Sequence, residues 1–137
     1  MKKPPTYSDE NFQKKFESAE LPTEQFTHRA HLRLTYLYIN KYGVEEAIVK
    51  ISDQLLNYVR KHNAESKFNA TLTIAAVKTV NHFLKKSVAR SFEDFIMEFP
   101  QLEKNFKGLI NQHYTIDVFN SEFAKKEFIE PDLLPYD

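Results

Sequence analysis

The scarcity of glycine constrains this chain more than any other single feature, since only two of its 137 residues are glycine. Tight β-hairpin turns and phosphate-cradling loops rely on glycine, which adopts positive φ angles without steric cost. No P-loop or dinucleotide-binding fingerprint occurs in the sequence. We therefore expect an all-α fold. The length fits a single domain over residues 1–137, large enough to bury about two-thirds of the surface of the unfolded chain.

Charge and composition narrow the function classes. Nineteen basic residues balance nineteen acidic ones, and cysteine is absent. Neutrality argues against an electrostatic nucleic-acid binder, and the lack of cysteine excludes disulfides and thiolate ligands and fits a reducing compartment. No apolar run approaches the ~18 residues of a membrane span, and the first residues lack the apolar stretch of a signal peptide. We therefore predict a cytoplasmic protein that binds neither nucleic acid nor membrane.

Apolar residues recur every three or four positions along most of the chain, which is the period of amphipathic helices. The pattern predicts helices over residues 9–18, 28–41, 44–61, 71–86 and 91–100, a short one over 102–110, and a last turn or two from 121. Two prolines in the tail, Pro131 and Pro135, forbid regular helix there. The expected architecture is a bundle of about five to six helices with an extended C-terminal tail.

The first candidate site is the segment 26–33, in which His28 and His31 are three residues apart. On a helix this spacing puts both imidazoles on one face. The pair falls in the first turn of the predicted second helix, where free N–H groups and the helix dipole favour neutral histidine, able to bind a metal or accept a proton. The same helix end attracts anions, and Arg29 or Arg33 would add charge. Alternatively, one histidine caps or packs while the other is solvated.

The second candidate begins the predicted fourth helix, where Asn69 or Thr71 would be the N-cap and Thr73 lies one turn further. Alone, this is an ordinary helix start. Short connections make consecutive helices antiparallel, so the second and fourth helices should begin at the same end of the bundle. We therefore predict one polar pocket there. Its expected lining is His28, His31, Arg33, Asn69, Thr71 and Thr73.

The third candidate is the segment 111–114, whose polar residues include His113 and Tyr114. It follows the weakest predicted helix, so two interpretations stay open: it returns to the same pocket, or it forms a surface loop. In the first case Tyr114 would line the site. His113 would join His28 and His31 as ligands of a divalent metal or as acid–base groups.

At these residues the chain resembles a family of small bacterial proteins of unknown function. The resemblance covers most of the chain, through the segments 26–33, 42–43, 67–73, 91–95, 113–114 and 128–133. It implies no established activity. Members of that family often have Tyr-His-Glu-Thr where this chain has Phe68-Asn69-Ala70-Thr71, so a histidine and a glutamate are missing here. Asn69 can hydrogen-bond a ligand, but it cannot shuttle protons and ligates metals poorly.

Three hypotheses follow from the sequence. The first is a site for a small anionic ligand around His28 and His31, with or without a divalent metal, in which Arg33, Thr71 and Thr73 would hold the anion. The second is a non-catalytic protein–protein interaction module or a helical homodimer, favoured by the absence of proton-transfer groups at Asn69 and Ala70. In the third, the histidines only hold the helix starts together. We rank binding of a small molecule first, and binding ahead of catalysis.

Overall fold

The computed structural model describes residues 7–137, and over these residues it is helical with no strand, which confirms the all-α prediction. The α-helices are α1 (Asp9–Glu17), α2 (His28–Tyr42), α3 (Val44–Lys61), α4 (Ala70–Leu84), α5 (Phe92–Glu98), α6 (Gln101–Lys104), α7 (Phe106–Asn111) and α8 (Glu122–Lys126). Two 3₁₀ turns, η1 (Thr23–Gln25) and η2 (Glu65–Lys67), precede α2 and α4. The single short helix predicted over 102–110 is instead the pair α6 and α7, because Asn105 leaves helical geometry at φ −143°.

Side-chain caps fix where the helices begin. The side chains of Ser8, Thr27, Asn69, Ser91 and Ser121 each accept a hydrogen bond from the backbone N–H three residues later, at the starts of α1, α2, α4, α5 and α8. Each cap satisfies one N–H that the helix itself cannot. Helix starts are therefore encoded locally, which is why their positions were predictable.

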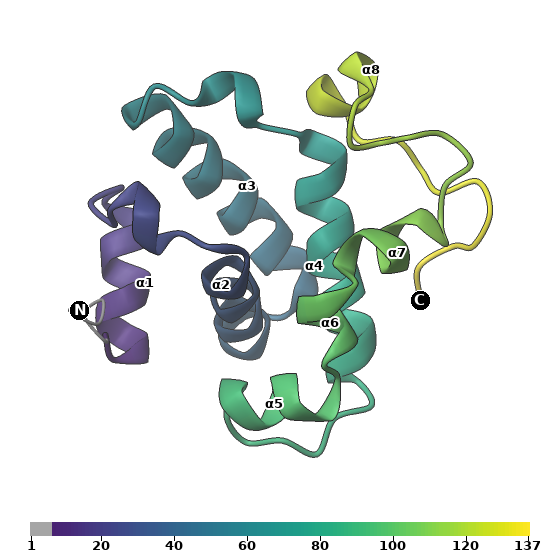
Figure 1. Cartoon of the computed structure of the whole chain (residues 1–137). Helices are drawn as coiled ribbons and strands as arrows, with labels where there is room; N and C mark the ends of the chain where they lie inside the picture. The colour runs from purple at the N-terminus through teal and green to yellow at the C-terminus, as the bar shows by residue number, and fades with distance from the viewer. Residues whose placement is uncertain (1–6) are drawn as a thin grey trace.

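Helix α2 occupies the middle of the molecule, with α1 on one side and α3 and α4 on another (Figure 1). Figure 1 shows α2 nearly end-on while α3 and α4 lie in the plane of the view and run in opposite directions. A simple up-down winding therefore describes α3 and α4 but not α2, which crosses them. Gly43 makes this change of direction possible: its φ of +84° lies in the region that other residues avoid, and it joins α2 directly to α3.

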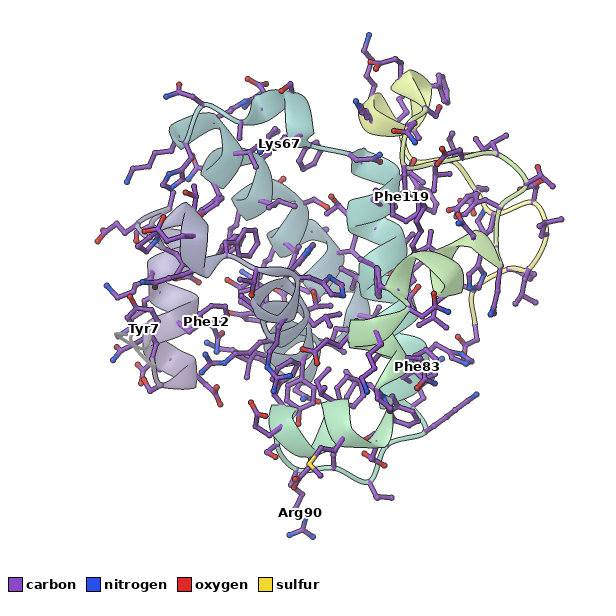
Figure 2. All side chains as sticks on the ribbon, in the orientation of Figure 1. Tyr7, Phe12, Lys67, Phe83, Arg90 and Phe119 are labelled. Atoms are coloured by element: carbon purple, nitrogen blue, oxygen red, sulfur yellow. The ribbon has the colours of Figure 1, made fainter. Side chains whose placement is uncertain are left out.

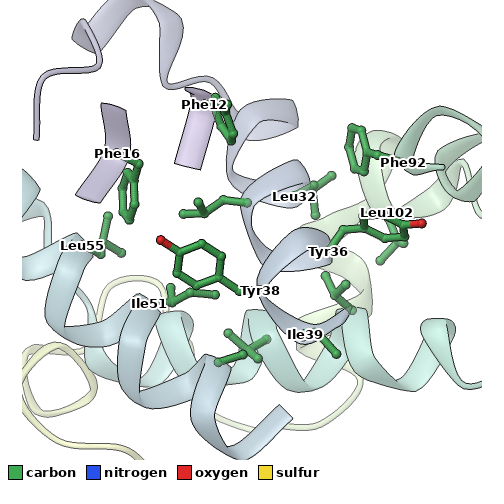
Figure 3. Packing of buried hydrophobic residues seen from close by; sticks show 14 of the residues in the cluster. Phe12, Phe16, Leu32, Tyr36, Tyr38, Ile39, Ile51, Leu55, Phe92 and Leu102 are labelled. Atoms are coloured by element: carbon green, nitrogen blue, oxygen red, sulfur yellow. The ribbon is translucent and has the colours of Figure 1, made fainter. Parts of the chain in front are cut away.

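The main hydrophobic core surrounds α2 (Figure 3). Tyr38, Phe16 and Ile51 are completely buried in it. The rings of Phe16, Phe26 and Tyr58 pack with centroids 5.0–5.5 Å apart, the range in which aromatic pairs attract. Because α2 is held from several sides, the direction of its first turn is fixed by packing.

A second, smaller core lies on the other face of α4. It consists of Ala75, Ile110, Tyr114, Val118 and Ala124, contributed by α4, α7, α8 and the segments between them. The chain after α8 contains no helix, as predicted, and it lies against α4 and α7. None of the helices between residues 7 and 137 is long and apolar enough to cross a membrane.

Candidate functional site

A cavity of about 370 Å³, which we call the His31 cavity, is lined by residues of α2, α3, α4 and α7 and by Phe119 from the segment after α7. Figure 2 shows Lys67 and Phe119 near the beginning of α4, on either side of that helix. The polar residues in the wall of the His31 cavity are His28, His31, Thr35, Lys67, Asn69 and Thr73. The starts of α2 and α4 thus meet at one cavity, and four of the predicted site residues, His28, His31, Asn69 and Thr73, line it.

His31 is the unusual member of this wall. Its Nε2 atom is buried and has no hydrogen-bond partner. Burial, together with a smaller effect of the nearby His28, lowers the pKa of its imidazole from 6.5 to about 4. The side chain is therefore neutral near pH 7. Leaving a buried polar atom unpaired costs about 1–3 kcal/mol, and such atoms are uncommon in folded proteins.

His28, by contrast, already has a partner. Its Nε2 lies 3.0 Å from the backbone carbonyl oxygen of Leu102, which can only accept, so Nε2 carries the hydrogen in this bond. The ring packs against Phe106 with centroids 5.1 Å apart. His28 therefore attaches the start of α2 to α6 and α7.

Asn69 and Thr73 form the α4 side of the cavity and are tied to the backbone. The Asn69 side chain is buried; its Oδ1 accepts from the Leu72 N–H at 3.0 Å and its Nδ2 donates to the Val118 carbonyl at 2.8 Å. The Thr73 hydroxyl donates to the Asn69 carbonyl at 2.7 Å, so its oxygen keeps accepting capacity. These residues give the wall a fixed shape.

Thr71 does not reach the cavity, contrary to the prediction. Its hydroxyl donates to the Glu127 carbonyl at 2.9 Å and accepts from the Ile129 N–H at 3.0 Å. Both hydrogen-bonding roles of this side chain are thus used to hold the tail on α4. The reason is the helical period: residues 69, 73, 76 and 80 of the α4 segment share the face toward the cavity, while residue 71 points to another side.

Arg33 does not line the His31 cavity either, contrary to the prediction. It lines a separate hollow of about 460 Å³ on another side of α2, which we call the Arg33 hollow and which also includes Phe12, Gln25 and Arg29. The Arg33 guanidinium forms an ion pair with Asp9 at 2.8 Å and lies over the Phe12 ring, 4.6 Å from its centroid. Arg33 therefore stabilises the contact of α1 with α2.

His113 and Tyr114 belong to the C-terminal part of the molecule. The His113 ring stacks on Tyr136 with centroids 3.8 Å apart, and its Nδ1 lies 2.6 Å from the Leu134 carbonyl oxygen. Tyr114 donates its hydroxyl to the Ile129 carbonyl at 2.7 Å, and burial raises the pKa of this phenol. Neither residue lines the His31 cavity, so the interpretation in which this segment returns to the pocket is wrong.

The predicted three-histidine metal site is not formed. His28 and His31 line one cavity, whereas His113 lines another beside Tyr136. Among residues 7–137 no group of three or more His, Cys, Asp or Glu side chains is arranged to hold a metal ion. The Asp132 carboxylate accepts hydrogen bonds from the N–H and hydroxyl of Thr115.

The prediction missed several residues of the cavity wall. Thr35 lies one turn after His31 on α2, a spacing that indicated the same face. Lys67 belonged to a segment already considered, but nothing in the sequence marked its side chain as part of the wall. Phe106 and Phe119 reach the cavity through contacts between distant segments, and no local signal identifies them.

Comparisons of the chain with protein-family models, with curated proteins and with solved structures found no match.

Proposed function

We propose that this protein binds a small molecule in the His31 cavity. The observation that carries the proposal is the buried, unpaired Nε2 of His31 in the cavity wall. A ligand that hydrogen-bonds this atom removes the cost of leaving it unpaired. The volume of about 370 Å³ falls within the usual range of ligand pockets, roughly 300–1,000 Å³.

The wall supports binding better than catalysis. His28 and Asn69 are already engaged with the backbone, and Asn69 cannot transfer protons. No aspartate or glutamate is among the described residues that line the cavity. General acid–base catalysis commonly uses two positioned proton-transfer groups, and only His31 has an unengaged nitrogen in a buried position. The proposed ligand is therefore held without being transformed.

A fragment screen followed by NMR tests this proposal. A mixture of small acids, alcohols, amines and heteroaromatic compounds is added to the ¹⁵N-labelled chain, and we expect shifts at His31 and Thr73. Ala76→Phe, which fills the cavity from α4, should abolish them. Val49→Phe adds the same volume at an exposed position of α3 and should leave them unchanged. If no fragment shifts residues of the cavity wall, the proposal is wrong.

A second proposal concerns self-association. Ile116, Phe123, Leu133 and Leu134, all in the C-terminal part, are 45–60% exposed. Four of the large apolar side chains that are exposed among the described residues thus belong to the C-terminal part, and we propose a homodimer through this part of the molecule. Sedimentation velocity at high concentration should show a dimer that Phe123→Asp dissociates. A wild-type monomer at all concentrations would refute it.

A further inference from the structure

The charges around the His31 cavity are unbalanced. Lys67 lines it, and among residues 7–137 no carboxylate forms an ion pair with its Nζ. The described wall of the cavity contributes no acidic side chain. A wall with one unpaired cation and no anion is electrostatically complementary to a ligand with one negative charge.

Most of the polar groups of the wall come from the starts of two helices. His31 and Thr35 come from the first two turns of α2, and Asn69 and Thr73 from the start of α4, which follows Lys67 directly. The neutral imidazole keeps one N–H, which can donate to an anionic oxygen when the hydrogen is on Nε2. The positive end of the dipole of α4 favours an anion at the same place.

The rest of the wall is apolar. Val80 lies seven residues after Thr73 on α4, which is about 10 Å along the helix axis. Around it the wall is formed by Leu55, Ala76 and other carbon side chains. Apart from the polar residues already named, every lining residue is apolar, so a second charge or a row of hydroxyls would find few partners, and burying one without a partner costs several kcal/mol.

On the basis of the proposed function, we infer that the ligand is a small hydrophobic monocarboxylate, with its carboxylate toward His31 and Lys67 and its apolar body between α3 and α4. Its size is limited by the cavity volume of about 370 Å³, near the lower end of the usual range of ligand pockets, roughly 300–1,000 Å³. A straight or aromatic acid of eight to nine carbons fits this description.

Titration calorimetry with four probes of equal chain length tests the class of ligand. Octanoate should bind the full chain at least tenfold more tightly than octan-1-ol, which lacks the charge. Octylamine, with the opposite charge, should bind most weakly. Octanedioate should also bind weakly, because its second carboxylate would lie against the apolar part of the wall.

Three variants test the orientation of the ligand in the cavity. Lys67→Ala should lower the affinity for octanoate three- to tenfold and leave the affinity for octan-1-ol unchanged. Arg90→Ala removes an exposed cation at the opposite end of the molecule from Lys67 in Figure 2 and should affect neither. His31→Leu should remove the preference for the acid while octan-1-ol still binds. Lys67 and Arg90 are exposed, and circular dichroism verifies that each variant, His31→Leu included, folds.

The outcomes separate this inference from the proposed function. If octan-1-ol or octylamine binds as tightly as octanoate, or if Lys67→Ala behaves like Arg90→Ala, the monocarboxylate is wrong while a ligand cavity remains. If none of the four probes and no fragment of the mixed screen shifts the residues of the cavity wall, the proposed function fails as well.

Discussion

The two hollows beside α2 differ in how their polar groups are satisfied. In the Arg33 hollow, Arg33 pairs with Asp9, and Arg29 pairs with both Glu93 and Glu103. In the His31 cavity the cation of Lys67 has no ion-pair partner among the described residues, and a buried imidazole nitrogen has no hydrogen bond. The Arg33 hollow is the larger of the two, about 460 Å³ against about 370 Å³.

Our proposal therefore rests on unmet bonding capacity in the His31 cavity and not on volume, since the Arg33 hollow is the larger of the two. Ion pairs of Arg29 and Arg33 join α1, α5 and α6 to α2. The arginines of the larger hollow therefore stabilise the fold. That hollow does contain one buried unpaired acceptor, Gln25 Oε1. Its surroundings already combine both signs of charge, and they do not select a ligand of either sign.

The largest expected effect is a loss of stability from a change in the Arg33 hollow. Phe12→Ala removes a ring that is 3% exposed and lies under the Arg33 guanidinium. It should lower the free energy of unfolding by about 3–5 kcal/mol, since it empties part of the core. Urea denaturation measures this loss. Where the variant remains folded, octanoate affinity should be unchanged, and a parallel loss of binding would show that the two hollows are not independent.

The second effect is on the pH dependence of stability. Above pH 6.5 His31 is neutral in both the folded and the unfolded chain. As the pH falls from 6.5 to about 4, the unfolded chain binds a proton that folded His31 does not, because burial lowers the folded pKa to about 4. The free energy of unfolding should therefore fall over this range, by up to about 3 kcal/mol.

His31→Leu provides the control for this pH effect. The other titrating groups are shared by both proteins, so the difference between their unfolding free energies isolates His31. This difference should change between pH 6.5 and 4 and be constant above 6.5. Parallel stability curves for the two proteins would contradict the assignment of a neutral, buried imidazole.

A third, smaller effect concerns the unpaired nitrogen itself. At pH 7 and without ligand, His31→Leu should stabilise the protein by about 1–2 kcal/mol, because it replaces an unsatisfied buried polar atom with an apolar side chain. Thermal unfolding measures this gain. A residue that costs stability until a ligand arrives is typical of a functional position. A destabilised variant would indicate that the imidazole has a structural role instead.

The smallest effect should come from the ion pairs of the larger hollow. Arg29 has a side chain that is 40% exposed, and its partner Glu93 is 72% exposed. Exposed pairs contribute little, so Arg29→Met should cost less than about 1 kcal/mol. Raising the salt concentration should shrink the difference between this variant and the wild type further. A larger loss would mean that the paired charges organise α5 and α6 more strongly than we infer.

Local signals in the sequence were sufficient for the helices and for part of the site. Caps such as Thr27 and Asn69 and the three-to-four spacing of apolar residues located the long helices. The convergence of His31 with Asn69 and Thr73 was predicted from helix order, although α2 crosses α3 and α4 where an antiparallel arrangement had been assumed.

The remaining errors arise from contacts between distant parts of the chain. The Thr71 hydroxyl accepts a hydrogen bond from the N–H of Ile129, which is 58 residues away in sequence. The His113 ring stacks on Tyr136. No local pattern shows where a segment without helical periodicity will lie. The position of Arg33 depends on α1, whose packing against α2 is likewise decided by the tertiary fold.

Asn69 has a consequence for the chain beyond α7. The same amide that forms part of the cavity wall donates to the Val118 carbonyl, and it is 6% exposed. On our proposal, a bound ligand that restricts the motion of Asn69 also restricts the motion of the chain around residue 118, through this hydrogen bond. Digestion by a protease around residues 115–121 should accordingly slow when the cavity is filled, so this stretch, which also contributes Phe119 to the wall, reports on occupancy.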